Sequence, residues 1–218
     1  MPLRTALVIM ARYPAPGTVK TRLAQTIGAH RACELYQAFL HDLGRRFSGG
    51  RRELIWAYHP PASDFAAVIA GGARCVPQAG AGLGPRMHNC FRSLCAEGYH
   101  KLLLIGADVP HVRDEWLDEA ERALDSTDVV LGPTKDGGYY LIAMRQPHDV
   151  FSGIAMGTPR VFAQTVTRAR TLGLRVHLIA PTFDIDEAED LLGLRALLDE
   201  PGTVPLPHTA ALLQRWPR

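Results

Sequence analysis

Residues 101–110 read Lys-Leu-Leu-Leu-Ile-Gly-Ala-Asp-Val-Pro, an apolar run that stops at Gly-Ala-Asp and is closed by a proline. A run without polar alternation is typical of a strand that is buried on both faces, as in the centre of a parallel sheet. Ligands of open α/β sheets bind outside the carboxyl ends of such strands, and Asp108 lies at that end. The Asp108 carboxylate is therefore either a turn former before Pro110 or a ligand for a metal or a substrate.

The pattern around this stretch alternates between strands and helices. Apolar residues at helical spacing predict an amphipathic helix over residues 29–47. Thr158 followed by Pro159 predicts the start of another helix, which runs to about residue 172. Further strands are expected at residues 6–11, 53–58, 74–77, 128–133 and 175–180. This alternation predicts an α/β fold with a mainly parallel central sheet flanked by helices.

Length and composition narrow the class of protein. The 218 residues favour one domain, with a short C-terminal tail from about residue 201. A hydrophobic content of 47% supports a packed core, and a net charge of +2 gives no electrostatic footprint for nucleic acid. The four cysteines show no zinc-site spacing. We find no signal-peptide pattern and no apolar stretch of ~18 residues that could span a membrane, so we expect a cytoplasmic protein.

A basic segment follows the first expected strand. Residues 12–23 contain two prolines and a glycine, and Lys20 and Arg22 come shortly after them. The segment is either a solvated basic turn or an anion-binding loop, because a connection from strand to helix offers free backbone N–H groups to a phosphate. It does not match the Walker A motif.

Two glycine-rich segments have a similar ambiguity. Residues 78–86 carry glycine at alternate positions, which is typical either of a flexible connection or of a surface on which a flat ligand can lie against the main chain. Residues 136–138 read Asp-Gly-Gly, a common hairpin turn, yet they follow a strand and could stand on the same rim as Asp108.

Acidic residues also follow the last expected strand. Asp186 with Glu189 three positions later predicts a capping box, which explains these two residues without catalysis, whereas Asp184 has no such explanation. If Asp108, Asp136 and the pair after the last strand converge, their oxygens form a site suited to Mg²⁺ or Mn²⁺. The basic segment would complete a pocket for a diphosphate.

Four motifs in the same order resemble the bacterial DUF2064 family of glycosyltransferase-A-fold proteins, which are classed as nucleotide-diphospho-sugar transferase-like. They are the Pro-x-Pro-Gly-x-Val-Lys-Thr-Arg-Leu core of residues 11–23, Leu-Ile-Gly-Ala-Asp-Val-Pro at 104–110, Leu-Gly-Pro through Asp-Gly-Gly-Tyr-Tyr-Leu at 131–141, and Asp-Ile-Asp at 184–186 with Asp190 and Leu191. The Lys-Thr-Arg-Leu segment is also similar to that of the 2-phospholactate guanylyltransferases. The resemblance departs from the family pattern at Gly82, where an acidic residue is usual.

The resemblance implies a role for each matched position. Asp108 would be the metal carboxylate and a catalytic residue, with Asp184 or Asp186 as a further metal ligand. Asp136 would line the acceptor side, and its place after a strand makes it the candidate to orient or deprotonate an acceptor hydroxyl. Nucleotide binding would fall to Arg12, Lys20, Arg22, Gly82, Gly84 and Arg86, and the acceptor side to Gly137, Gly138 and Tyr139.

We therefore expect a metal-dependent transferase that uses a nucleotide-diphospho-sugar donor and a small-molecule acceptor, with Mg²⁺ or Mn²⁺ as cofactor. One alternative is a nucleotidyltransferase that uses a nucleoside triphosphate and releases pyrophosphate. A second alternative is a nucleotide-binding protein that has no turnover.

Overall fold

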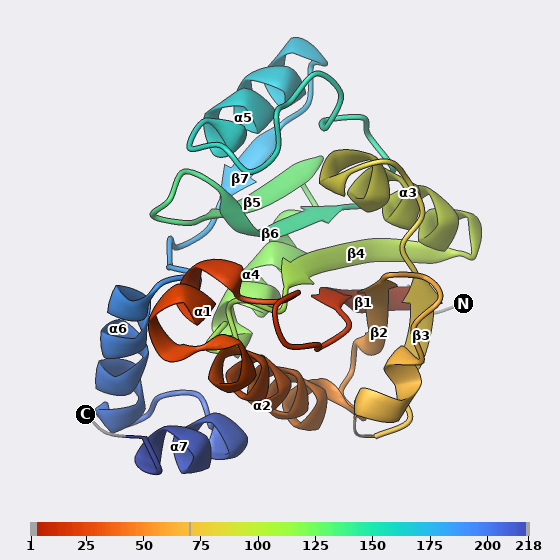
Figure 1. The fold of residues 1–218 in the computed structure, drawn as a ribbon. Coiled ribbons are helices and arrows are strands. Elements are labelled where there is room, and N and C mark those ends of the chain that lie inside the picture. The colour runs from red at the N-terminus through yellow and green to blue at the C-terminus, as the bar shows by residue number, and fades with distance from the viewer. Residues whose placement is uncertain (1–3, 70, 217–218) are drawn as a thin grey trace.

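A computed structural model describes residues 4–69 and 71–216 and contains a seven-stranded sheet in the order β3-β2-β1-β4-β6-β5-β7 (Figure 1). Every neighbouring pair is parallel except the two that β6 makes with β4 and β5. The mainly parallel sheet expected from the sequence is confirmed. The strands are β1 (Arg4–Arg12), β2 (Glu53–His59), β3 (Arg74–Pro77), β4 (Tyr99–Gly106), β5 (Val129–Pro133), β6 (Tyr139–Met144) and β7 (Val176–Leu178).

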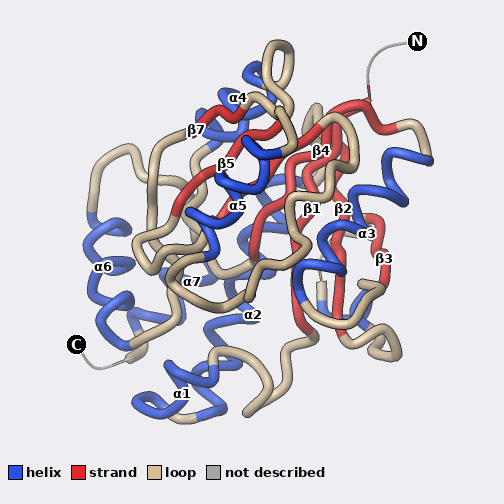
Figure 2. The backbone as a smooth tube through the Cα atoms, turned by 90° about the horizontal axis from the view of Figure 1, so that it is seen from above, coloured by secondary structure: helices blue, strands red, loops and turns tan. Residues whose placement is uncertain are grey.

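Helices cover both faces of the sheet (Figures 1 and 2). The core on one face includes side chains from α2, α4, α6 and α7, and the core on the other face includes side chains from α3 and α5. The helices are α1 (Thr21–Ile27), α2 (Ala29–Phe47), α3 (Leu83–Ala96), α4 (Asp114–Ala123), α5 (Val161–Thr171), α6 (Ala188–Asp199) and α7 (Pro207–Gln214), with a short 3-10 turn at Phe65–Val68. The helix predicted over residues 29–47 has the predicted bounds.

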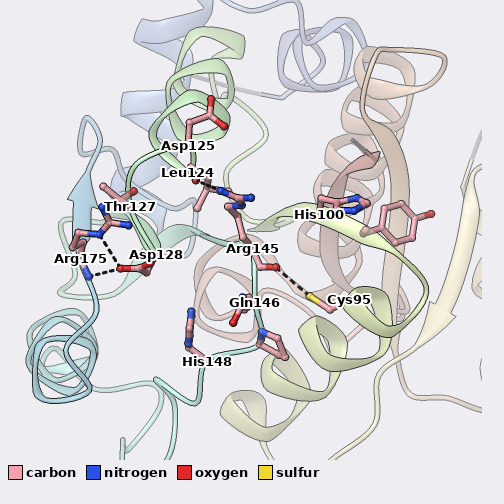
Figure 3. A pocket seen from close by; sticks show the side chains of 12 residues that line it. Cys95, His100, Leu124, Asp125, Thr127, Asp128, Arg145, Gln146, His148 and Arg175 are labelled. Atoms are coloured by element: carbon pink, nitrogen blue, oxygen red, sulfur yellow. Dashed lines mark hydrogen bonds and ion pairs between the residues drawn. The ribbon is translucent and has the colours of Figure 1, made fainter. Parts of the chain in front are cut away.

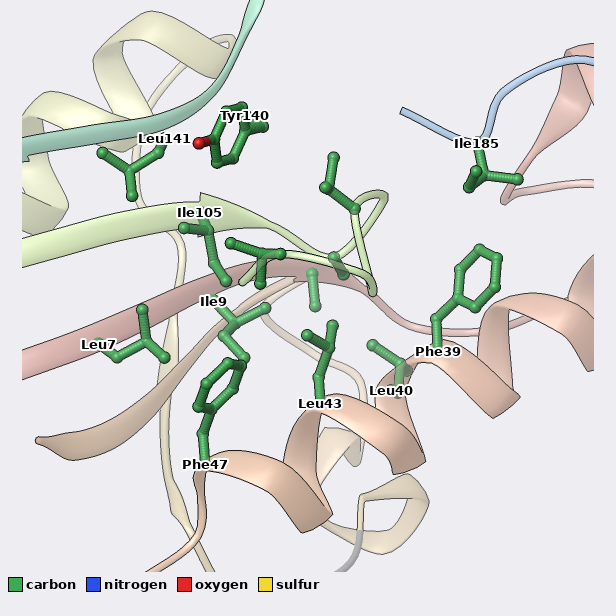
Figure 4. Packing of buried hydrophobic residues seen from close by; sticks show 14 of the residues in the cluster. Leu7, Ile9, Phe39, Leu40, Leu43, Phe47, Ile105, Tyr140, Leu141 and Ile185 are labelled. Atoms are coloured by element: carbon green, nitrogen blue, oxygen red, sulfur yellow. The ribbon is translucent and has the colours of Figure 1, made fainter. Parts of the chain in front are cut away.

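The central strands are apolar throughout because their two faces enter two different cores. On β1, Leu7 and Ile9 pack towards α2, whereas Val8 belongs to the core under α3 (Figure 4). On β4, Leu103 and Ile105 likewise share the α2 side. Period-two alternation of side chains therefore places hydrophobic residues on both faces, which is the pattern that the opening stretch predicted.

One predicted helix start and the extent of one predicted loop differ from the structure by a few residues. The helix predicted from Thr158 begins at Val161, because the Thr158 hydroxyl donates to the Ala155 carbonyl within a turn and caps no helix. The glycine-rich segment is shorter than expected, because α3 already begins at Leu83 with Gly82 as its N-cap.

The C-terminal tail contains the helix α7, which is anchored by a buried carboxylate from α2. Asp42 accepts hydrogen bonds from the backbone N–H groups of His208 and Thr209, both at 2.9 Å, and from the Thr209 hydroxyl at 2.6 Å. Because Leu206 at the N-cap has no side-chain cap, Asp42 supplies from another helix the acceptors that the first turn of α7 lacks.

All four cysteines are free thiols. Within residues 4–69 and 71–216, no helix is both long and apolar enough to cross a bilayer.

The chain order creates a crevice between β1 and β4. From β1 the chain continues to β2 on one side of the sheet, and from β4 it continues through α4 towards β5 on the other side. The connections therefore diverge from adjacent strands, which is the topological switch point at which open α/β sheets bind ligands. Asp108 follows β4 at this point.

Candidate functional site

A cleft of about 940 Å³ lies at the carboxyl ends of β1 and β4. Its walls come from the segment after β1, the loop after β4, the β5–β6 turn and the segment after β7. The structure brings ten of the predicted site residues to this cleft: Arg12, Lys20, Arg22, Arg86, Asp108, Asp136, Gly138, Tyr139, Asp184 and Asp186. The predicted Gly82, Gly84 and Gly137 lie nearby but do not form its lining.

Lys20 is the electrostatic centre of the cleft. Its side chain is 1% exposed, and its ammonium group forms ion pairs with Asp108 and, at 3.0 Å, with Asp186 Oδ1. Burial alone would lower the pKa of Lys20, but the charges of Asp108 and Asp186 outweigh it, and the pKa is raised. The lysine therefore stays protonated and holds together two carboxylates from distant parts of the chain.

The backbone at Lys20 is also unusual. Lys20 has a φ of 49° and a ψ of 43°, and it is the single non-glycine residue with positive φ in residues 4–69 and 71–216. The left-handed conformation is unfavourable for a residue with a Cβ. The ion pairs to Asp108 and Asp186 offset this cost.

A single backbone hydrogen bond places the two later aspartates beside Asp108. The Ile185 N–H donates to the Asp108 carbonyl at 3.0 Å, and the Ile185 side chain is fully buried. Asp184 and Asp186, on either side of this buried side chain, both line the cleft, where Asp186 contacts Lys20 and Arg22.

The capping box predicted from Asp186 and Glu189 is wrong by one residue. Glu187 caps α6, and Asp190 closes the box by accepting the Glu187 N–H at 2.7 Å. Because the cap is one residue later, the Asp186 carboxylate is not used by the helix. It instead accepts from the Arg22 guanidinium at 2.5 Å, so the sequence-based structural explanation for Asp186 does not hold.

The surroundings of Asp184 disfavour the ionised form of its carboxyl group. Burial raises its pKa to about 6, and the neighbouring charges of Asp186 and Asp136 add to the shift. Asp186 behaves in the opposite way, because Lys20 and Arg22 outweigh its burial and lower its pKa. Asp184 therefore binds a proton more tightly than an ordinary aspartate does, and Asp186 binds one less tightly.

This donor set fits a divalent cation whose remaining ligands come from a substrate. The described residues contain no cluster of three or more His, Cys, Asp or Glu side chains arranged as a metal site. Mg²⁺, however, commonly takes only one or two carboxylates together with substrate phosphates. Asp108 is half-exposed to the cleft, and the raised pKa of Asp184 marks a position where added positive charge would be stabilising.

The Asp-Gly-Gly segment is the β5–β6 turn, as its hairpin reading predicts, and it also stands on the rim of the cleft. One Asp136 oxygen accepts from the Thr134 hydroxyl at 2.5 Å and from the Gly138 N–H at 2.9 Å. Gly137 has a φ of 88°, and a Cβ there would lie 2.1 Å from the Pro159 carbonyl oxygen. The turn is therefore packed directly on the loop before α5.

The glycine-rich segment contributes to the cleft through its side chains and less through its glycines. Arg86 and Leu83 line the cleft, and Leu83 is 48% exposed. Gly84 is buried, and a Cβ there would lie 3.0 Å from the end of Met156. The missing side chain of Gly84 serves the packing of α3 on the loop at Met156, and its contact with a nucleotide stays a prediction.

Two cleft residues were missed by sequence reasoning. Gln78 donates both amide hydrogens to backbone carbonyls, of Ala57 at 2.7 Å and of Ala11 at 3.2 Å. The orientation of the Gln78 amide is fixed, because a flip would place its oxygen against the two carbonyl oxygens. Tyr36 fits the apolar face of α2, yet its hydroxyl accepts the Arg12 N–H at 2.9 Å in the wall of the cleft. A polar residue directly after a strand was the available signal for Gln78, whereas Tyr36 gave none.

A second hollow, of about 540 Å³, lies at the opposite edge of the sheet (Figure 3). Its lining includes Asp125, Arg145 and Arg175, and none of the predicted site residues belongs to it. There Lys101 pairs with Asp125 at 2.6 Å, an arrangement that resembles the pair of Lys20 and Asp108 but lies outside the switch point.

Comparisons with known proteins agree with this geometry. A candidate nucleotide-diphospho-sugar transferase from Desulfovibrio desulfuricans G20 superposes with a TM-score of 0.89 at 31% identity, over 97% of this chain and 95% of that one. A cytidylyltransferase from Leptospira borgpetersenii serovar Hardjo-bovis has a TM-score of 0.61 at 14% identity, over 97% and 93% of the two chains, and shows the shared fold. A phosphoenolpyruvate guanylyltransferase from Sphaerobacter thermophilus is 27% identical over 199 residues, which are 85% of this chain and 94% of that protein.

The sheet and the cleft at its switch point define an α/β fold of the nucleotidyltransferase and glycosyltransferase-A type. The chain belongs to the DUF2064 family, described as uncharacterized proteins conserved in bacteria, whose profile matches residues 40–158. Both the predicted family and the predicted fold are confirmed, and the relatives support transferase activity.

Proposed function

We propose that this chain is a metal-dependent nucleotidyltransferase that binds a nucleoside triphosphate in the cleft and releases pyrophosphate. The observation that carries the proposal is the set of four basic residues, Arg12, Lys20, Arg22 and Arg86, on one cleft that also holds four aspartates. A triphosphate carries more negative charge than a sugar-linked diphosphate and makes fuller use of this set. The similarity to a guanylyltransferase points the same way. The proposal reverses the order of the two transferase hypotheses drawn from the sequence.

In the proposed reaction an anionic oxygen of a small acceptor attacks the α-phosphorus. The bond from that phosphorus to the oxygen that bridges it to the β-phosphorus breaks, and pyrophosphate carries away the electron pair. Protonated Lys20 and Arg22 stabilise the charge that develops on the phosphate oxygens. Asp108, with Asp184 or Asp186, would hold Mg²⁺ or Mn²⁺, which when bound neutralises phosphate charge and orients the triphosphate.

Two other parts of the cleft wall would bind the base of the nucleotide and the acceptor. Exposed Leu83 offers an apolar surface to the base, and the Gln78 amide oxygen, which accepts no hydrogen bond within residues 4–69 and 71–216, offers an acceptor to a base N–H. On the other side, Asp136 has one oxygen engaged by its own turn, so its second oxygen would orient the acceptor together with Gly138 and Tyr139. The cytoplasmic location and the operation of residues 1–218 as one domain remain predictions.

Glycosyl transfer from a nucleotide-diphospho-sugar is the second candidate, favoured by the similarity to the Desulfovibrio desulfuricans G20 protein. The two reactions break different bonds and release different products. Incubation with each of the four nucleoside triphosphates, Mg²⁺ and phosphorylated three-carbon acids is expected to release pyrophosphate. Release of a nucleoside diphosphate from a nucleotide sugar, with no pyrophosphate from any triphosphate, would refute nucleotidyl transfer.

Asp108→Asn tests the site. We expect turnover to fall at least about 100-fold, since the neutral amide cannot replace a carboxylate towards a divalent cation. Asp125→Asn is the matched control, because Asp125 also pairs with a largely buried lysine but lies at the opposite edge of the sheet. Binding of a triphosphate with no turnover by the wild-type protein would instead support a nucleotide-binding protein without activity.

A further inference from the structure

The Tyr36 side chain has one hydrogen-bonding group whose proton is unused. Tyr36 is 3% exposed, and its ring packs in the core between α2 and the sheet. Its hydroxyl oxygen accepts the Arg12 N–H at 2.9 Å. Within residues 4–69 and 71–216, the hydroxyl donates no hydrogen bond, and the bond from Arg12 is the one that it takes part in.

The position of the hydroxyl is fixed from two sides. The N–H that it accepts belongs to the last residue of β1, at the edge of the sheet where the cleft opens. Tyr36 itself belongs to the lining of that cleft, beside Lys20 and Asp108. Since the Arg12 N–H already occupies one lone-pair direction of the oxygen, the O–H bond must point elsewhere, and the cleft is the direction that the core does not fill.

The electrostatic environment keeps the Tyr36 hydroxyl protonated, so that it remains a hydrogen-bond donor. Burial raises the pKa of Tyr36, and the negative charge of Asp108 adds to the shift. The phenol is therefore neutral throughout the physiological range. A neutral O–H in a cleft that is also lined by Lys20 and Arg12 suits an anionic oxygen and offers little to a second cation.

We propose that Tyr36 binds the substrate directly, by donating its hydroxyl proton to a phosphate oxygen of the nucleotide polyphosphate. This inference rests on the proposed function, since it names a further contact for the same substrate. A buried donor without an acceptor costs free energy in the empty protein, and the ligand oxygen removes that cost on binding. Tyr36 would thus contribute to affinity for the polyphosphate and leave recognition of the base unchanged.

Tyr36→Phe removes the hydroxyl and keeps the ring in the core. Tyr140→Phe is the matched control, because Tyr140 lines the same cleft but its hydroxyl donates to the Ala180 carbonyl at 3.0 Å. Each variant leaves one backbone group without its hydroxyl partner, so both should lose thermal stability by similar amounts. Only Tyr36→Phe should change the binding of phosphate.

The test is calorimetric titration, in Mg²⁺, of inorganic tripolyphosphate and of the nucleoside triphosphate that most stabilises the wild-type protein. Tyr36→Phe is expected to bind both at least about tenfold more weakly, while Tyr140→Phe binds both as the wild type does. Unchanged tripolyphosphate binding by Tyr36→Phe overturns the inference but leaves the proposed function standing. A wild-type protein that binds neither probe overturns both.

Should Tyr36→Phe not fold, the wild-type protein provides a second measurement. With tyrosine labelled at Cζ, the Tyr36 carbon signal is assigned through its own ring and Cβ connectivity and followed by NMR as tripolyphosphate is added. A shift at Tyr36, with the Tyr140 signal unchanged, is expected. An unmoved Tyr36 signal at saturating tripolyphosphate overturns the inference.

Discussion

Replacement of Lys20 by methionine tests whether its ammonium group holds the cleft together. Methionine keeps the apolar stem against the core but leaves Asp108 and Asp186 without their shared partner. Removing one member of a buried ion pair typically costs about 3–5 kcal/mol. Here Asp108 is 48% exposed and can be hydrated, and Asp186 keeps Arg22 at 2.5 Å. We therefore expect a loss of about 3 kcal/mol, at the low end of that range.

For a chain of this size that loss corresponds to a decrease in Tm of about 6–12 °C. The measurement is urea and thermal unfolding at pH 7.5 with EDTA, so that no divalent cation replaces the ammonium group. Lys101→Met is the control, because its carboxylate partner Asp125 is 65% exposed and hydrated, so that breaking this pair should lower the stability much less than Lys20→Met does.

Adding Asp186→Asn to Lys20→Met should recover part of the loss, because one uncompensated charge is then removed. A Lys20→Met protein that unfolds like the wild type would show that the two ion pairs contribute nothing to stability and that Lys20 does not hold the cleft together. The same conclusion would follow if the double variant were less stable than Lys20→Met alone.

Two further predictions concern other carboxylates. Because the folded-state pKa of Asp184 is raised to about 6 from an ordinary 3.8, its stability contribution is full below pH 3.8 and is lost as the pH rises through 6. Asp184→Asn should therefore be more stable than the wild type by about 1 kcal/mol at pH 7.5 in EDTA, a value that is discounted for the partial exposure of Asp184. This difference in stability should vanish near pH 4. A difference that is the same at pH 4 and pH 7.5 would contradict the raised pKa. Asp42→Ala should lower the stability by about 2 kcal/mol, because three donors at the start of α7 lose their acceptor, and thermal unfolding measures it. Triphosphate affinity should be unchanged in Asp42→Ala, and a large change would mean that α7 influences the cleft.

Much of the fold was predictable because its signals are local. The apolar run ending at Asp108 predicted a central strand and the site edge, and the spacing in residues 29–47 predicted α2 with its bounds. The errors at Thr158 and Asp186 have a common cause. Both residues can cap a helix, but a neighbouring turn or a distant cation offered each of them a better partner.

The organisation of the site was only partly predictable because it depends on long-range contacts. The sequence identified Lys20, Asp108 and Asp186 as separate candidates, and no local pattern shows that one ammonium group contacts both carboxylates. Tyr36 was hidden for the reverse reason, since a tyrosine at an apolar helix position gives no sign that its hydroxyl reaches another strand. Tertiary contacts alone distinguish such residues from ordinary core residues.

The contact between Gly137 and the Pro159 carbonyl has a consequence for how this protein could change its acceptor. The Phe162 N–H also donates to the Gly137 carbonyl at 2.9 Å, so the β5–β6 turn and the start of α5 are joined on both sides of one glycine. Insertions or exchanges in either loop alone would collide with the other. Laboratory evolution or loop grafting aimed at a new acceptor should therefore exchange residues 134–138 and 156–162 as one cassette.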